Sequence, residues 1–151
     1  MEQLDEIAEM SKTTPVAIFK HSTRCGISRM VLRNFEGTYS LKDEQLKLYY
    51  LDLLAHRNIS DEVGFKFQVL HQSPQLIVIK NNEIIANDSP KNLYQKPSEH
   101  YVAALFDDVN QVTIDGKNVL LYPHQIKIVV NSNYTATVVN SYFKGFYWLI
   151  E

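Results

Sequence analysis

The sequence predicts an α/β domain followed by a small β-rich region within one chain of 151 residues. Helix-patterned and strand-patterned segments alternate through the first half, in the order helix, strand, helix, strand, helix, strand, strand. From residue 110 onward, short strand-like segments follow one another with turn residues between them. Because these two patterns differ, we expect two domains, residues 1–88 and residues 89–151.

Apolar spacing and turn residues place three helices and four strands in the first half. Pro15 ends the first helix, and Asn58 or Ser60 is expected to cap the third. A turn at Asn81 and Asn82 joins the last two strands into a hairpin. The expected elements are helix 4–10, strand 16–20, a helix after Cys25 that ends near Gly37, strand 46–52, a helix opening at 58–62, strand 75–80 and strand 83–86. A parallel βαβ unit followed by a hairpin and covered by helices is the thioredoxin-like arrangement.

The second half begins with two short helices at residues 89–94 and 97–106, each with a proline at or near its first turn. The later helix is expected to cover the sheet of the first half with an apolar face formed by Tyr101, Val102, Leu105 and Phe106. An Asp115–Gly116 turn separates two of the strands that follow. The expected strands are 112–114, 119–122, 126–130, 135–139 and 147–150.

Composition is typical of a globular protein, with 45% hydrophobic and 21% charged residues. The formal net charge of -2 gives no general attraction to nucleic acid or acidic membranes, so we expect neither as a partner. No apolar run approaches the roughly 20 residues of a membrane span, and the acidic amino terminus is unlike a signal peptide. A single cysteine excludes a disulfide framework and a cysteine-based zinc site. We therefore expect a cytoplasmic protein with no metal site.

The one cysteine, Cys25, lies where a strand gives way to a helix. The dipole and the free backbone N–H groups of a helix N-terminus favour the thiolate, which is the nucleophilic form. Arg24 and His21 are among the residues that add positive charge nearby. Ser28 stands where a Cys-x-x-Cys pair would have its second cysteine, so any disulfide chemistry must finish on another molecule. A small buried cysteine is the alternative, but its location and Ser73–Pro74 favour a reactive thiol.

Pro74 directly precedes the strand at residues 75–80. A cis Ser73–Pro74 bond there is expected to leave a backbone edge facing the thiol, ready to pair with a substrate. An ordinary proline at the entry of a strand is the alternative.

Three segments in this order resemble the YtxJ-like monothiol bacilliredoxins, a thioredoxin-fold group: FKHSTRCGIS at 19–28, YYLDL at 49–53 and HQSPQ at 71–75. The resemblance covers about residues 4–86. It implies reduction of mixed disulfides between proteins and bacillithiol or a similar small thiol, which is a co-substrate and not a cofactor. In this interpretation Cys25 attacks the sulfur of the small thiol. The family often has proline after the cysteine, and Gly26 here makes the helix start less rigid.

The other site residues take roles that follow from this chemistry. Ser28 is expected to be an inert stand-in in the catalytic site, at the place of the second cysteine, and able to hydrogen-bond the thiolate. Ser73 with Pro74 shapes the edge where a substrate docks. His21 is either a general base or a packing or surface residue, and Arg24 is either a charge partner or a solvated side chain. The remaining histidines lack metal-ligand spacing and are expected to be structural or surface residues: His56, His71, His100 and His124.

Residues 88–151 are similar to the segment that follows the ATPase domain of ABC-transporter ATP-binding subunits and enters their OB-like TOBE domain. The segments 89–97, 101–106, 121–125 and 136–145 carry this resemblance. The chain has no G-x-x-x-x-G-K-[ST] loop, so it is not expected to hydrolyse ATP. An incomplete OB-like sheet leaves a free strand edge and the aromatic residues Phe143, Phe146, Tyr147 and Trp148, so we predict a homodimer through this half.

Three functions stay open, of which a monothiol oxidoreductase acting on protein mixed disulfides is favoured. A non-catalytic interaction protein that joins a thioredoxin-like scaffold to a transporter-derived β-module is the main alternative. A transferase or iron–sulfur carrier on the same fold is the third. A stacking platform for single-stranded nucleic acid is disfavoured because the sequence lacks a basic stripe.

Overall fold

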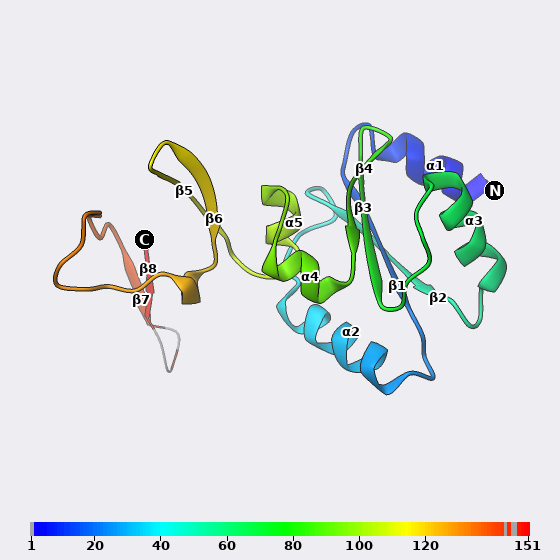
Figure 1. The fold of residues 1–151 in the computed structure, drawn as a ribbon, viewed down its shortest axis with the longest axis horizontal. Coiled ribbons are helices and arrows are strands. Elements are labelled where there is room, and N and C mark those ends of the chain that lie inside the picture. The colour runs from blue at the N-terminus through cyan, green and yellow to red at the C-terminus, as the bar shows by residue number, and fades with distance from the viewer. Residues whose placement is uncertain (1, 144, 146–147) are drawn as a thin grey trace.

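A computed structural model of the chain describes residues 2–143, 145 and 148–151. Its main body is a four-stranded sheet with helices on both faces, and two small hairpins follow toward the C-terminus (Figure 1). In chain order the elements are α1 (Glu2–Met10), β1 (Val16–His21), α2 (Gly26–Thr38), β2 (Lys47–Asp52), α3 (Arg57–Phe67), β3 (Gln75–Lys80), β4 (Glu83–Asp88), α4 (Pro90–Gln95), α5 (His100–Ala104), β5 (Asn110–Ile114), β6 (Lys117–Leu121), the 3-10 turn η1 (Pro123–Gln125), β7 (Ser141–Phe143) and β8 (Trp148–Ile150).

The four-stranded sheet has the strand order β2-β1-β3-β4. β1 pairs parallel with β2 across α2, and it pairs antiparallel with β3. β3 and β4 form a hairpin whose turn residues Asn81 and Asn82 have φ values of 53° and 63°. Asparagine tolerates this left-handed region better than most residues, which explains why it occupies the turn. The predicted thioredoxin-like order of elements is confirmed.

The sheet is covered on both faces because neighbouring side chains of β1 and β3 point in opposite directions. Ala17 and Phe19 join a core that also contains residues of α2, α4 and α5. Val16 and Ile18 join a second core formed with α1 and α3. Strands buried on both faces have almost continuous apolar sequences, as residues 16–19 of β1 do.

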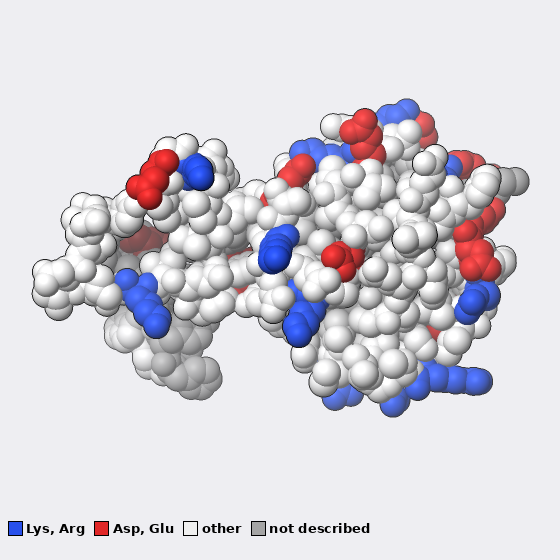
Figure 2. Space-filling model, in the orientation of Figure 1, with Lys and Arg blue, Asp and Glu red and all other residues white. Residues whose placement is uncertain are grey.

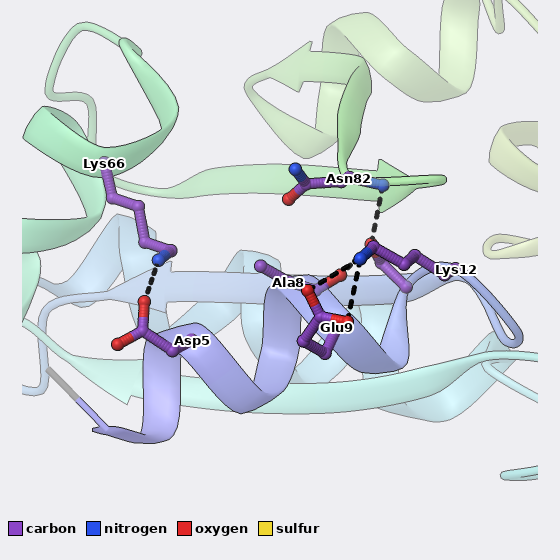
Figure 3. A network of polar contacts seen from close by, with 7 residues as sticks. Asp5, Ala8, Glu9, Lys12, Lys66 and Asn82 are labelled. Carbon is purple, nitrogen blue, oxygen red and sulfur yellow. Dashed lines mark hydrogen bonds and ion pairs between the residues drawn. The ribbon is translucent and has the colours of Figure 1, made fainter.

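Helix α1 is attached to both α3 and the β3–β4 hairpin by polar contacts (Figure 3). Lys66 of α3 donates a hydrogen bond to the carboxylate of Asp5 in α1. Beyond the other end of α1, the backbone N–H of Asn82 donates to Ser11 Oγ at 2.8 Å. These contacts hold α1 in place over one face of the sheet.

The other face is completed by residues that follow β4. Val102, Leu105 and Phe106 are buried in the same core as Phe19, which confirms that the segment predicted as a helix at 97–106 covers the sheet. Tyr101 is an exception, because it is 39% exposed and its ring lies 4.4 Å from Lys80 Nζ. Tyr122 also belongs to this core, and its hydroxyl donates to the Ala103 carbonyl at 3.3 Å. The core thus includes residues well beyond position 88, where the domain boundary was predicted.

Two predicted strands, residues 126–130 and 135–139, are wrong, since both segments are irregular and exposed. Their apolar side chains meet no buried face: Ile128 is 81% exposed and Val130 is 101% exposed. Strand propensity alone does not form a sheet without such packing. Instead, β5–β6 and β7–β8 form two separate hairpins, which project beyond α4 and α5 (Figure 1).

The predicted OB-like sheet is therefore not confirmed. Of the four aromatic residues expected at its free edge, Phe143 and Trp148 are exposed, whereas Phe146 and Tyr147 lie outside the described residues.

The predicted cap of α3 is also wrong. The helix begins at Arg57 with His56 as its N-cap residue, so Asn58 and Ser60 lie inside the helix. The chain enters the helix earlier because the backbone N–H of His56 already closes a turn on the Asp52 carbonyl at 3.0 Å.

Leu105 tests whether the segment after α5 is an integral part of the body. We expect Leu105→Ala to lower the free energy of unfolding by about 2–5 kcal/mol, because it leaves a cavity in the core shared with β1. Urea unfolding followed by circular dichroism measures this change. Leu70→Ala is the matched control, since Leu70 is 85% exposed; a similar small effect for both variants would contradict the shared core.

Candidate functional site

The only cysteine of the chain lies at the N-terminus of α2. Cys25 is the N-cap residue, its backbone is extended (φ -92°, ψ 119°), and its side chain is exposed. Its carbonyl accepts the first helical hydrogen bond from the Arg29 N–H at 3.0 Å. Its side chain forms no cap hydrogen bond, and the positive end of the helix dipole at this position favours the thiolate. The alternative of a buried cysteine is excluded.

Ser28 holds the loop that carries Cys25. It is fully buried, and its Oγ accepts a hydrogen bond from the backbone N–H of Ser22 at 3.0 Å. The first turn of α2 is thereby connected to the end of β1, with Cys25 between the two bonded residues. The predicted hydrogen bond from Ser28 to the thiolate stays a prediction.

Asp52, at the end of β2, fixes the same loop from the other side. Its carboxylate accepts hydrogen bonds from the Leu54 N–H and from Thr23 Oγ1, each at 3.0 Å. The Leu54 hydrogen bond, and to a lesser degree that from Thr23, lowers the pKa of Asp52, while burial opposes them. A charged carboxylate thus anchors the residue two positions before Cys25. Sequence reasoning missed this role, although Asp52 lies within one of the recognised segments.

His21 and Arg24 flank this loop in different environments. The Nδ1 atom of His21 is buried without a hydrogen-bond partner, and the ring lies edge-on to Phe19 with 6.4 Å between centroids. These contacts favour a packing role, and the general-base role stays a prediction. Arg24 is exposed and forms no ion pair within the described part of the chain, as expected for a solvated side chain.

Ser73 and Pro74 lie directly before β3, and the bond between them is cis as predicted. Since β3 runs antiparallel to β1, β3 starts at the end of the sheet where β1 finishes, and Lys20 is paired there with Gln75. This end of the strands is the sheet edge that carries the candidate site. The Cys25 loop leaves β1 at this edge as well. The topology therefore brings the two sequence-predicted parts of the site to one edge of the sheet.

Sequence reasoning also missed a set of polar residues beneath that edge. Lys20 and Gln75 are completely buried, and Lys20 Nζ lies 3.5 Å from His71 Nδ1. His71 was predicted only as a structural or surface residue. A signal was present in the alternation of β1, because Lys20 occupies the same face as the buried residues Val16 and Ile18.

Neither a metal centre nor a membrane span is found among the described residues. No three His, Cys, Asp or Glu side chains of that part are grouped as a metal site requires. None of its helices has the length and apolar character needed to cross a bilayer.

A thioredoxin-like sheet with an exposed cysteine at the start of α2, and a proline before β3 at the same edge, defines a thiol oxidoreductase. More particularly, the chain belongs to the monothiol bacilliredoxin BrxC family, whose family model matches residues 1–97. The resemblance of the first half to bacilliredoxins is confirmed by this match. The resemblance of residues 88–151 to TOBE-like segments stays a prediction.

Solved structures share the fold. One described as a candidate oxidoreductase with a thioredoxin fold is 30% identical, with 59% of this chain and 76% of the other covered and a TM-score of 0.49. A thioredoxin from Malassezia sympodialis is 20% identical, with 66% and 84% covered and a TM-score of 0.50. The second likeness shows that the fold is that of a thioredoxin.

Ser28 provides a test of how the loop is held. We expect Ser28→Ala to lower the free energy of unfolding by about 1–3 kcal/mol, because the Ser22 N–H loses its acceptor in a buried place. Chemical denaturation measures the change. Ser40→Ala, at an exposed position, is the control and should leave stability unaltered. Equal stability of the two variants would show that the bond does not hold the loop.

Proposed function

We propose that the chain is a cytoplasmic monothiol oxidoreductase that reduces mixed disulfides between proteins and bacillithiol or a similar small thiol. The observation that carries the proposal is the exposed Cys25 at the N-terminus of α2, in a chain with no second cysteine. The match to the bacilliredoxin family supports the choice of substrate class.

The reaction consists of two thiol–disulfide exchanges. In the first, the Cys25 thiolate attacks the small-thiol sulfur of a protein mixed disulfide, so a new disulfide joins Cys25 to the small thiol. The protein sulfur leaves as a thiolate and takes a proton from water. In the second, the thiolate of another small-thiol molecule attacks this disulfide, which releases Cys25 and forms the oxidised dimer of the small thiol. Together, the two steps convert one protein mixed disulfide and one free small-thiol molecule into the free protein thiol and the disulfide of the small thiol.

The surrounding residues have roles in this reaction that suit a monothiol mechanism. Ser28 and Asp52 hold the loop so that the sulfur stays exposed at the helix N-terminus. Ser73 and Pro74 provide the edge on which the substrate backbone docks. Arg24, exposed beside the thiol, is a binding residue for the small-thiol half, and His21 supports the loop by packing.

Substitutions of Cys25 and of Ser28 test whether the protein needs only one reacting side chain of its own. We expect Cys25→Ser to abolish the release of small thiol from a bacillithiol-modified protein. Ser28→Ala is expected to retain turnover to within about tenfold of the unaltered protein, because Ser28 positions the loop but forms no bond with the substrate sulfur. The assay follows the appearance of the free protein thiol with bacillithiol as reductant.

Mass spectrometry supplies the second part of this test. During turnover, the unaltered protein should carry one small-thiol adduct on Cys25, and so should protein isolated from its own cells. An unreactive Cys25 would instead support a non-catalytic interaction protein. Visible absorbance of the purified protein would support the iron–sulfur carrier.

For the C-terminal part we propose pairing with a second copy of the chain through a TOBE-like module. Among the described residues of this part, large apolar side chains such as Ile128, Val130 and Val139 are exposed, and Figure 2 shows wide uncharged areas on the part of the molecule that carries β5 to β8. Exposed apolar areas of this kind tend to be covered in an assembly. The two short hairpins also leave strand edges free for pairing.

Ile128 and Val130 test this pairing. We expect the double substitution Ile128→Ser and Val130→Ser to convert a dimer into a monomer without loss of stability, because both side chains are exposed within one chain. Light scattering after size exclusion measures the mass. Phe65→Ser in α3, where Phe65 is 88% exposed, is the control. A monomeric unaltered protein, or an unchanged dimer in the double variant, would contradict the proposed surface.

A further inference from the structure

Two polar side chains are buried opposite each other where the central strand β1 ends and β3 begins. Lys20 of β1 and Gln75 of β3 are paired in register, and both are completely buried. They share the sheet face whose other central positions are apolar, such as Ile18 and Ile77. Burying an ammonium group is unfavourable unless it has partners, so its presence here indicates a specific task.

Gln75 fixes the backbone of the loop before β3. Its Nε2 donates to the Leu70 carbonyl at 2.7 Å, and its Oε1 accepts from the Gln72 N–H at 3.3 Å. Nε2 also donates to Asn87 Oδ1 of β4 at 2.8 Å, which sets the orientation of the amide. The residue held between the two backbone contacts is His71.

Lys20 fixes the side chain of the same residue. Its Nζ lies 3.5 Å from His71 Nδ1, and an ammonium group can only donate. Burial lowers the pKa of Lys20, whereas Asp61 opposes this shift and Arg57 adds to it. With Lys20 in its protonated form, Nδ1 is the acceptor and the ring proton is on Nε2. His71 is itself exposed, so the ring can present this second nitrogen to solvent.

The charges around the ring support the neutral form. Burial lowers the pKa of His71, the positive charges of Lys20 and Arg57 lower it further, and Asp61 opposes them. Arg57 and Asp61 both lie in the first turns of α3, with Arg57 Nε 3.8 Å from Asp61 Oδ1. Two cations facing one carboxylate leave an excess of positive charge next to the ring, which suits an anionic ligand.

We propose that His71 is a binding residue whose Nε2–H, directed outward by Lys20 and Gln75, donates a hydrogen bond to a carboxylate of the small-thiol half of the mixed disulfide. The inference rests on the function proposed above. The location supports it, because the loop that carries His71 continues into Ser73 and Pro74 at the sheet edge where the Cys25 loop begins.

Nuclear magnetic resonance of the ring nitrogens tests the positioning without any assay of activity. In the unaltered protein we expect one His71 tautomer, protonated at Nε2, with a titration midpoint below the ordinary value of about 6.5. Lys20→Met, of similar length, should raise this midpoint and mix the tautomers, whereas the His100 signals should not change. Identical His71 signals in both proteins would overturn the role of Lys20.

A pair of chemically matched substrates tests the ligand. One peptide cysteine is disulfide-linked either to 3-mercaptopropionate, which has a carboxylate, or to 2-mercaptoethanol, which has none. We expect His71→Ala to raise KM for the carboxylate substrate about tenfold, as loss of a charge-assisted hydrogen bond does, with kcat and the neutral substrate almost unaffected. His71→Gln, which keeps an N–H donor, should restore part of the difference, and His100→Ala is the control.

The outcomes separate this inference from the function on which it rests. An equal loss on both substrates, or no loss on either, would overturn the carboxylate contact while the oxidoreductase function stands. Failure of the unaltered protein to react with either disulfide would overturn the function, and the ring-nitrogen measurement would still decide whether Lys20 orients His71.

Discussion

The central strand β1 determines where every part of the site lies. It is hydrogen-bonded to β2 on one side and to β3 on the other, and its residues are buried under helices on both faces. A strand constrained in this way can neither shift its register nor bend without exposing apolar side chains. The loop that follows β1 therefore starts from a fixed position. This loop leads directly to Cys25 at the start of α2, so the place of the cysteine is fixed as well.

Around this strand, polar contacts with distant residues complete the site. Thr23 is bound to Asp52 of β2, Ser22 to Ser28 of α2, and Lys20 to His71 in the loop before β3. Each contact attaches a different neighbouring element to the last residues of β1 or to the loop after it. The sulfur itself is left exposed, so the structure combines a rigid support with an accessible nucleophile.

In a monothiol mechanism, the protein supplies one reacting thiol and a small molecule supplies the other. In the proposed reaction, the chain with its one cysteine supplies a positioned thiolate and a docking edge, and the second thiol comes from solution. Recognition of the small thiol is then as important as recognition of the protein substrate. The role proposed for His71 would meet this need, since one N–H in a defined direction distinguishes ligands by their acceptor groups.

The order of helices and strands in the first half followed from the sequence alone, because apolar periodicity and turn residues such as Asn81 and Asn82 act locally. The place of Cys25 at a helix start followed for the same reason. In contrast, the exposed strand-like residues 126–130 formed no strand, since periodicity does not show whether a buried face is available.

By itself, the sequence determined the fold class of the first half, the single nucleophile and the proline before β3. Only the tertiary structure decided which side chains support that nucleophile. Lys20 and His71 are 51 positions apart, and Thr23 and Asp52 are 29 apart. Contacts between such distant residues arise when paired strands bring them to one sheet edge, and no local pattern in the chain records them.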